Sequence, residues 1–300
     1  MSRPAAGGRR GPGQGRGGRA AAGRRSGPSR SRGAGRTGPV RRDGDPKPRR
    51  QQKGLGGEQV EGRQAVRELL LAQRRKAHEV WISSELEGSD AVDDIVAIAK
   101  ANRVPVIYVA RKKLEMTARS EAPQGVLAMA AELPEADLGR YLRRRGAHQP
   151  FLVAVDGVTD PGNLGAIVRS CEGAGVDAVV VPRHRAVHVT PTVAKASAGA
   201  VEHVPIAVVG GLPSALRRIR DAGIWIIGLD DAADRSLFEI EELATDGVCV
   251  VLGAEGAGLS RLVRERCDMV VSIPMHGRVG SLNVSAAAAL AAYEITRHRK

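Results

Sequence analysis

Cysteine is scarce in this sequence, and no apolar run is long enough to cross a membrane. The three cysteines, Cys171, Cys249 and Cys267, are odd in number and lack the spacing of a metal site. This argues against a disulfide framework and against a bound metal, and we expect buried thiols in a reducing compartment. The stretch 285–292 is Ala-rich but falls short of the ~18 apolar residues of a membrane span. The composition therefore predicts a soluble cytoplasmic protein without a membrane partner.

Acidic and aromatic residues are nearly missing from the first 50 residues. This segment holds 14 arginines, one lysine and two aspartates, and it has no aromatic residue. It carries the whole formal net charge of +13, because the other 250 residues hold 31 basic and 31 acidic groups. A segment with so little apolar surface cannot offset its chain entropy, so residues 1–53 are predicted to be a disordered basic tail.

Such a tail suits a flexible polycation that binds phosphates without reading sequence. The alternative is a solubilising tail that has no specific partner. A targeting segment is not favoured, because there is no apolar stretch of 7–15 residues and Gly and Pro would break an amphipathic helix.

The first part of the remaining chain alternates between helical and strand-like patterns. Helical periodicity is expected over 61–75, 90–101 and 112–119, with short apolar runs typical of strands at 79–82, 104–109 and 125–130. These patterns predict a small α/β domain over residues 54–132. A stretch containing Pro and Arg, 133–150, is predicted to be a linker with one short helix at 136–145.

The second part contains near-continuous runs of Val, Ile and Leu. They lie at 151–155, 178–181, 224–229, 248–252 and 269–273. Strands that are covered on both faces of a parallel sheet have this composition. Residues 151–300 are therefore predicted to form a second α/β domain around a parallel sheet.

Three segments of the second domain place polar or Gly-rich sequence directly after a predicted strand. They are 156–165, 251–260 and 273–285. Ligands of open α/β sheets bind beyond the carboxyl ends of strands, so a site is expected here. The first and third segments also have an ordinary structural explanation. Asp160 before Pro161 is a good helix start, and Ser281, Asn283 and Ser285 are all suitable helix caps.

The glycines at 253–258 do not match the common nucleotide-binding loops. Their order is GxxGxG, and no acidic residue ends a following strand about 20 residues later, as a dinucleotide site requires. No Gly-Lys-Ser/Thr follows, so the loop is not a phosphate-binding P-loop either.

Arg169 cannot be assigned to a site from helical spacing alone. On a helical wheel the apolar stripe of its helix consists of Ala166, Ile167, Ser170 and Ala174, and Arg169 lies more than 90° from the centre of that stripe. Spacing therefore favours a solvated residue.

Together and in this order, the three segments closely resemble the three motifs of the SpoU-type (TrmH-like) RNA ribose methyltransferases of the SPOUT superfamily. The matching residues are 163–169, 253–256, 273–275 and 281–285. Upstream, residues 60–66 resemble the opening of that family's small ribosomal-protein-like RNA-binding domain. The resemblance covers residues 54–300, and Gly280 departs from it where some relatives carry serine. It implies a catalytic domain with a deep C-terminal trefoil knot, working as a homodimer.

The resemblance also implies a reaction and the residues that carry it. The cofactor is S-adenosyl-L-methionine, and the methyl group goes to a ribose 2′-hydroxyl. Arg169 matches an arginine that approaches the target ribose and its phosphate. The residues that shape the reaction centre are Asn163, Glu255, Ser281 and Asn283. Those that contact the cofactor are Gly253, Ile273, Leu282, Leu252, Gly256 and Met275.

The order of small domain, linker and catalytic domain is most similar to bacterial enzymes that methylate a guanosine ribose in 23S rRNA. A tRNA or another rRNA site is the alternative within the family, because the motifs do not separate these targets. A non-catalytic RNA-binding or ribosome-assembly protein would retain the fold, but here every expected reaction-centre residue is present. A nucleotide-dependent dehydrogenase is disfavoured by the missing dinucleotide pattern.

Overall fold

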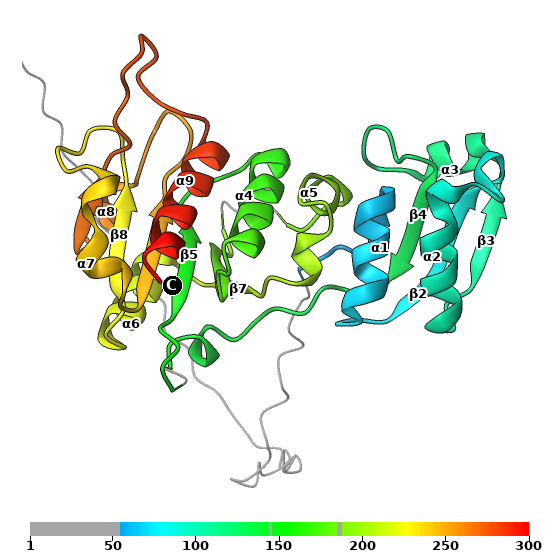
Figure 1. Cartoon of the computed structure of the whole chain (residues 1–300), viewed down its shortest axis with the longest axis horizontal. Helices are drawn as coiled ribbons and strands as arrows, with labels where there is room; N and C mark the ends of the chain where they lie inside the picture. Colours follow the sequence, from blue (N-terminus) through cyan, green and yellow to red (C-terminus); the bar gives the residue numbers. More distant parts are fainter. Residues whose placement is uncertain (1–54, 144–145, 185–187, 300) are drawn as a thin grey trace, which may run out of the picture. The chain divides into compact units, whose positions relative to one another are not determined.

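The computed structural model describes residues 55–143, 146–184 and 188–299 (Figure 1). The α/β class predicted from the sequence is confirmed, since helices alternate with the strands of two sheets. The basic segment 1–53 lies outside the described residues. The domain boundaries at 54–132, 133–150 and 151–300 stay predictions.

The first sheet has four strands in the order β1-β4-β2-β3. Its strands are β1 (Gln59–Glu61), β2 (Ala77–Ser83), β3 (Val106–Val109) and β4 (Val126–Ala130). Strand β3 runs parallel to β2, and the other neighbours are antiparallel. Helices α1 (Arg63–Ala72) and α2 (Asp90–Ala101) bury their apolar stripes in the same core as Val80 and Ile82. Helix α3 (Arg111–Thr117) contributes Leu114 to a separate cluster with Val109 and Leu127.

The second sheet has six parallel strands in the order β10-β8-β9-β5-β6-β7. The strands are β5 (Phe151–Val155), β6 (Ala178–Pro182), β7 (Ile206–Val209), β8 (Trp225–Leu229), β9 (Val248–Leu252) and β10 (Met269–Val271). Because every neighbouring pair is parallel, all carboxyl ends lie along one edge of the sheet. Strand β9 lies between β8 and β5, so the loops after these three strands are brought together.

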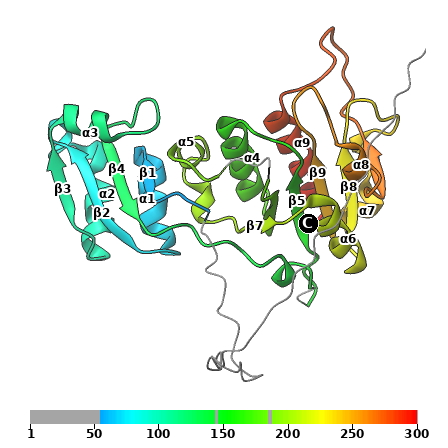
Figure 2. The same cartoon turned by 180° about the vertical axis from the view of Figure 1, so that it is seen from behind.

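Helices cover both faces of this sheet, as Figures 1 and 2 show from opposite sides. Helices α4 (Pro161–Gly173) and α9 (Val284–Arg297) pack against each other and share one core with Phe151 and Val153. Helices α6 (Leu212–Asp221) and α8 (Arg261–Arg264) share the other core with Leu152 and Val251. Strand residues that alternate between two cores explain the unbroken apolar runs in the sequence.

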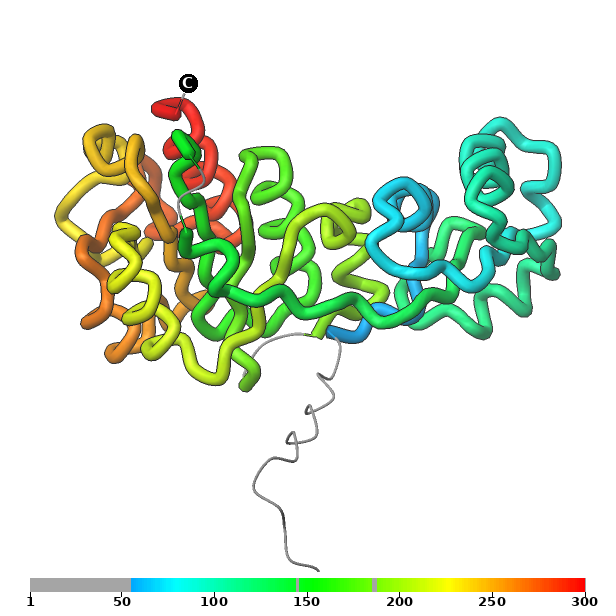
Figure 3. Tube along the Cα trace, turned by 90° about the horizontal axis from the view of Figure 1, so that it is seen from below, coloured from blue at the N-terminus to red at the C-terminus, as the bar shows by residue number. Residues whose placement is uncertain are grey.

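Short elements complete the described chain, which Figure 3 traces as a tube. They are α5 (Pro191–Ala196), α7 (Glu241–Ala244) and the 3-10 turns at Ser84–Leu86, Leu138–Arg140, Ala200–Glu202 and Leu237–Glu239. The helix predicted at 136–145 is wrong, because the residues described in that range form one 3-10 turn, capped by Asp137. In the described ranges, no helix combines the length and hydropathy needed to span a bilayer. The trefoil knot stays a prediction.

Candidate active site

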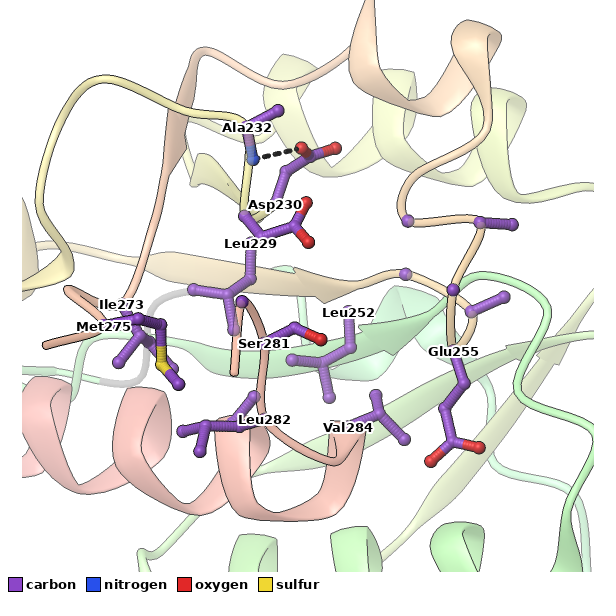
Figure 4. A pocket seen from close by; sticks show the side chains of 18 residues that line it. Leu229, Asp230, Ala232, Leu252, Glu255, Ile273, Met275, Ser281, Leu282 and Val284 are labelled. Atoms are coloured by element: carbon purple, nitrogen blue, oxygen red, sulfur yellow. Dashed lines mark hydrogen bonds between the residues drawn. The ribbon is translucent and has the colours of Figure 1, made fainter. Parts of the chain in front are cut away.

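A pocket of about 340 Å³ lies beyond the carboxyl ends of β8, β9 and β10 (Figure 4). This is the edge of the sheet at which ligands of open α/β folds bind, and the volume suits a small molecule. The lining comes from the ends of β8 and β9, the loops after β8, β9 and β10, and the start of α9. All six residues expected to contact a cofactor line it, namely Leu252, Gly253, Gly256, Ile273, Met275 and Leu282.

Apolar side chains form one side of the pocket. In Figure 4, Leu229, Ile273, Met275 and Leu282 gather on one side, and Glu255 lies on the other. An apolar wall of this kind can hold a flat ring, while polar groups at the opposite side fix its orientation.

The loop Gly253–Ser260 turns back on itself beside the pocket. The amide of Ala254 donates to the carbonyl of Gly258 at 3.0 Å, and the amide of Gly258 donates back to Ala254 at 2.9 Å. A Cβ atom at Gly253 would lie 2.3 Å from the carbonyl carbon of Gly258. Glycine at 253 is therefore required by the closeness of the loop's own backbone.

Three polar side chains from distant parts of the sequence meet next to this loop. Asn163 Nδ2 donates to Glu255 Oε1 at 3.0 Å, and Asn283 Nδ2 donates to the same oxygen at 2.7 Å. Asn283 Nδ2 also donates to Asn163 Oδ1 at 3.0 Å. We call Asn163, Glu255 and Asn283 the polar cluster. It contains one residue from each of the three sequence segments.

Helix capping explains how the two asparagines are aimed. Asp160 caps α4 by accepting from the amide of Asn163 at 2.7 Å, as the sequence predicted, and this leaves the Asn163 side chain free. Asn283 caps α9, because its Oδ1 accepts from the amide of Ser285 at 2.9 Å. Its Nδ2 then points to Glu255, so capping and cluster formation use opposite ends of one amide.

Ser281 and Arg169 do not belong to the polar cluster. Ser281 lines the pocket and is exposed. Arg169 is exposed on α4, and its side chain forms no hydrogen bond or ion pair with any residue in the described ranges. The buried residues of α4 are Leu164, Gly165, Ile167, Val168 and Cys171, so the stripe predicted from Ala166 and Ser170 is shifted. Arg169 lies outside the buried stripe in either case, free to meet a ligand.

The cysteines do not offer a nucleophile. Burial raises the pKa of the Cys171 thiol to about 12, and burial with nearby Asp268 raises the pKa of Cys267 to about 12. Burial also raises the pKa of Cys249. All three are protonated at neutral pH. Cys267 is only partly buried, so the expectation of three buried thiols is wrong for that residue.

The sequence reasoning missed some residues of the pocket. Leu229, Asp230 and Asp231 line it at the end of β8, and Val284 and Ala287 line it from the start of α9. A signal for Asp230 and Asp231 was available, since these acidic residues directly follow the strand-like run at 224–229. That run matched none of the three motifs from which the site residues were assigned.

Comparison with known proteins agrees with this geometry. Residues 150–293 match the SpoU rRNA Methylase family, and residues 59–136 match a family described as RNA 2′-O ribose methyltransferase substrate binding. YacO of Bacillus subtilis (strain 168), named as a TrmH family tRNA/rRNA methyltransferase, is 37% identical over 242 residues. The match covers 80% of this chain and 95% of YacO.

The chain belongs to the SpoU (TrmH-type) family of RNA methyltransferases.

Solved structures of the family support the assignment. The SpoU methyltransferase AviRb from Streptomyces viridochromogenes, in complex with the cofactor AdoMet, is 29% identical with a TM-score of 0.67. The alignment covers 80% of this chain and 89% of AviRb. An AdoMet-bound rRNA methyltransferase from Sinorhizobium meliloti is 26% identical with a TM-score of 0.65, over 80% of this chain and 87% of that chain. The predicted family and its parallel-sheet fold are confirmed.

Proposed function

We propose that this RNA methyltransferase transfers a methyl group from S-adenosyl-L-methionine to a ribose 2′-hydroxyl of structured RNA. The observation that carries the proposal is the polar cluster beside a pocket of apolar side chains and exposed loop backbone. Two structures that resemble this chain hold AdoMet. The family matched by residues 59–136 is described as a 2′-O ribose substrate-binding family.

The pocket fits this cofactor on its own chemistry. Leu252, Ile273 and Leu282 offer apolar contact for an adenine ring. The loop Gly253–Ser260 presents backbone amides and carbonyls, with Gly256 lying in open space at a φ of 72°. Gly253, Gly256 and Met275 complete the proposed cofactor contacts. When bound, the cofactor supplies a methyl group on a positively charged sulfonium.

The residues of this chain then have to position and activate the ribose hydroxyl. A hydroxyl is a poor nucleophile until it is polarised or loses its proton. Arg169 is exposed and has no partner among the described residues, so its guanidinium can approach the ribose and its phosphate. An arginine stays protonated, and we assign it electrostatic activation. The polar cluster and Ser281 shape the reaction centre around that hydroxyl, where positioning contributes much of the rate.

The proposed target is a guanosine of 23S rRNA. The order of the two family matches along the chain supports this choice, with the substrate-binding match first and the methylase match second. The named relatives are tRNA/rRNA methyltransferases, so a tRNA is the competing target. We further propose that the enzyme works in the cytoplasm as a homodimer with a knotted C-terminal chain.

Calorimetry on the purified protein tests the cofactor half of the proposal. S-adenosyl-L-methionine should bind with one site per chain, and NAD should give no heat above dilution. The physical reason is that the strand following the Gly253–Ser260 loop does not end in the acidic residue that a dinucleotide site requires. Binding of NAD instead of S-adenosyl-L-methionine would overturn the assignment in favour of a dehydrogenase. Binding of neither would favour a non-catalytic RNA-binding protein.

A further inference from the structure

Two carboxylates from neighbouring strands hold the end of the Gly253–Ser260 loop. Strand β9 leads into this loop and lies between β5 and β8 in the sheet. Asp156, directly after β5, accepts from the amide of Ser260 at 2.8 Å. Asp230, directly after β8, lies against the same part of the loop, since a Cβ atom at Gly258 would be 3.3 Å from its Oδ2. An aspartate therefore lies on each side of the loop where the loop leaves the pocket.

Asp230 has more partners than Asp156. Its carboxylate accepts from the amide of Ala232 at 3.1 Å, drawn as a dashed line in Figure 4. Arg264 Nη1 lies 2.6 Å from Asp230 Oδ2, and the Asp230 side chain is only 10% exposed. Because α8 follows the loop directly, this ion pair fastens the loop and α8 to the end of β8.

The charge state of Asp230 is consistent with this arrangement. Burial opposes the charged form, but hydrogen bonds from Arg264 and from the amide of Ala232 outweigh it, and the pKa lies below its ordinary value. The stabilisation is therefore complete above the unfolded-state pKa of about 3.9 and is lost as the pH falls through the folded-state pKa. Between pH 6 and 8 the carboxylate stays ionised.

We propose that Asp230, held by Arg264, is a positioning residue that fixes the Gly253–Ser260 loop in its ligand-binding shape. This rests on the proposed function, because the ligand is taken to be S-adenosyl-L-methionine. The backbone groups of the loop form the edge of the pocket, and a Cβ position at Gly258 lies 3.3 Å from Asp230 Oδ2. Loss of the carboxylate frees the end of the loop and lowers cofactor affinity.

A different explanation assigns Asp230 a direct attraction to the positive charge of the cofactor. The two explanations predict opposite effects of Arg264→Gln. If Asp230 positions the loop, loss of Arg264 loosens it and weakens cofactor binding. If Asp230 attracts the cofactor directly, loss of Arg264 removes a competing positive charge and strengthens binding.

Calorimetry and hydrogen exchange on the full chain test the proposal. Asp230→Asn and Arg264→Gln should each weaken binding of S-adenosyl-L-methionine by roughly tenfold, the effect of removing one charge-assisted hydrogen bond. Binding of S-adenosylhomocysteine, which lacks the sulfonium charge, should be weakened by the same factor. The KM for the cofactor should rise while kcat at saturation changes little. Asp234→Asn is the matched control, since Asp234 is exposed and its carboxylate has no hydrogen bond or ion pair among the described residues.

Hydrogen exchange without cofactor gives a reading that is independent of the ligand. The amides of Gly256, Gly258 and Leu259 should exchange faster in both variants than in the wild type or in Asp234→Asn. Unchanged exchange, or tighter binding by Arg264→Gln, would overturn the proposal even if the wild type binds the cofactor. If the wild type does not bind S-adenosyl-L-methionine, the proposed function fails, while faster exchange would still support the loop contact. If Asp230→Asn does not fold, Arg264→Gln decides the test. The Arg264 side chain is 42% exposed, so the fold should tolerate its replacement.

Discussion

Arg169 is the residue on which the proposed chemistry depends most. It is exposed on α4, whereas Asn163 on the same helix belongs to the polar cluster. A side chain in that position can reach RNA without touching the cofactor pocket, since it is not among the pocket residues. Binding and catalysis should therefore be separable at this site.

Arg169→Ala should lower the single-turnover rate of methyl transfer by roughly 10²-fold or more, the usual effect of removing one electrostatic contact to a transition state. Affinity for S-adenosyl-L-methionine, measured by calorimetry, should stay close to that of the wild type. Arg217→Ala is a suitable control, because Arg217 is exposed on α6 and has no partner in the described ranges. A loss of only a fewfold in rate would remove Arg169 from the proposed reaction centre.

The residues of the pocket show what sequence can and cannot indicate. The six residues expected to contact the cofactor were chosen by motif resemblance, and all of them line one pocket. The role of Asp230 could not be predicted, because it depends on Arg264 arriving from another element. Gly253 was expected only as a cofactor contact. The structure adds a second reason for glycine there, because a Cβ atom would lie 2.3 Å from the carbonyl carbon of Gly258.

Elements buried on both faces were the easiest to predict. The strands at 151–155 and 248–252 were expected with the bounds that β5 and β9 have, because alternate residues point into two cores. Strands β1 and β7 were not predicted, and β1 is only three residues long. The helix expected at 136–145 is wrong, because the residues described in that range form one 3-10 turn, Leu138–Arg140.

Helices α4 and α5 cross closely at Gly165. A Cβ atom there would lie 2.6 Å from Ala196 Cβ and 2.8 Å from the carbonyl oxygen of Val193. The glycine between Leu164 and Ala166 in the first motif therefore has a packing function, and it keeps α4 where Asn163 can reach Glu255.

Gly165→Ala should lower the free energy of unfolding by roughly 1–3 kcal/mol, as overpacking of a buried contact does. Denaturant titration measures this directly. Gly210→Ala serves as the comparison, because a Cβ atom at Gly210 meets nothing within 4 Å. Equal stability of the two variants would show that α4 and α5 can separate without cost, which contradicts the close crossing.

At the scale of the whole chain, charge is distributed very unevenly. Residues 1–50 carry the entire formal net charge of +13, and the other 250 residues are formally neutral. Long-range attraction to RNA must therefore come from this segment or from local basic patches. Its sequence offers arginines spaced by glycine, which suits binding to phosphates more than the reading of base edges.

Deletion of residues 1–50 should flatten the dependence of RNA affinity on salt by ~0.7–0.9 log units for each phosphate that the segment neutralises. The truncated protein should modify the same nucleotide, more slowly at subsaturating RNA and at nearly the same rate at saturation. Binding titrations at two salt concentrations measure the slope. An unchanged slope would favour a solubilising segment, and a changed nucleotide would place target selection in residues 1–50.

The central claim is that this chain methylates a ribose 2′-hydroxyl in RNA, and mass-spectrometric mapping of total RNA tests it most directly. Three RNA samples are compared. They come from cells that carry the gene, from cells that lack it, and from cells in which the missing gene is replaced by the Arg169→Ala variant. We predict one 2′-O-methylguanosine in 23S rRNA that is present with the wild-type gene and missing in the other two samples. A methylated tRNA position would keep the chemistry and change the target, whereas identical maps in all three samples would contradict the account.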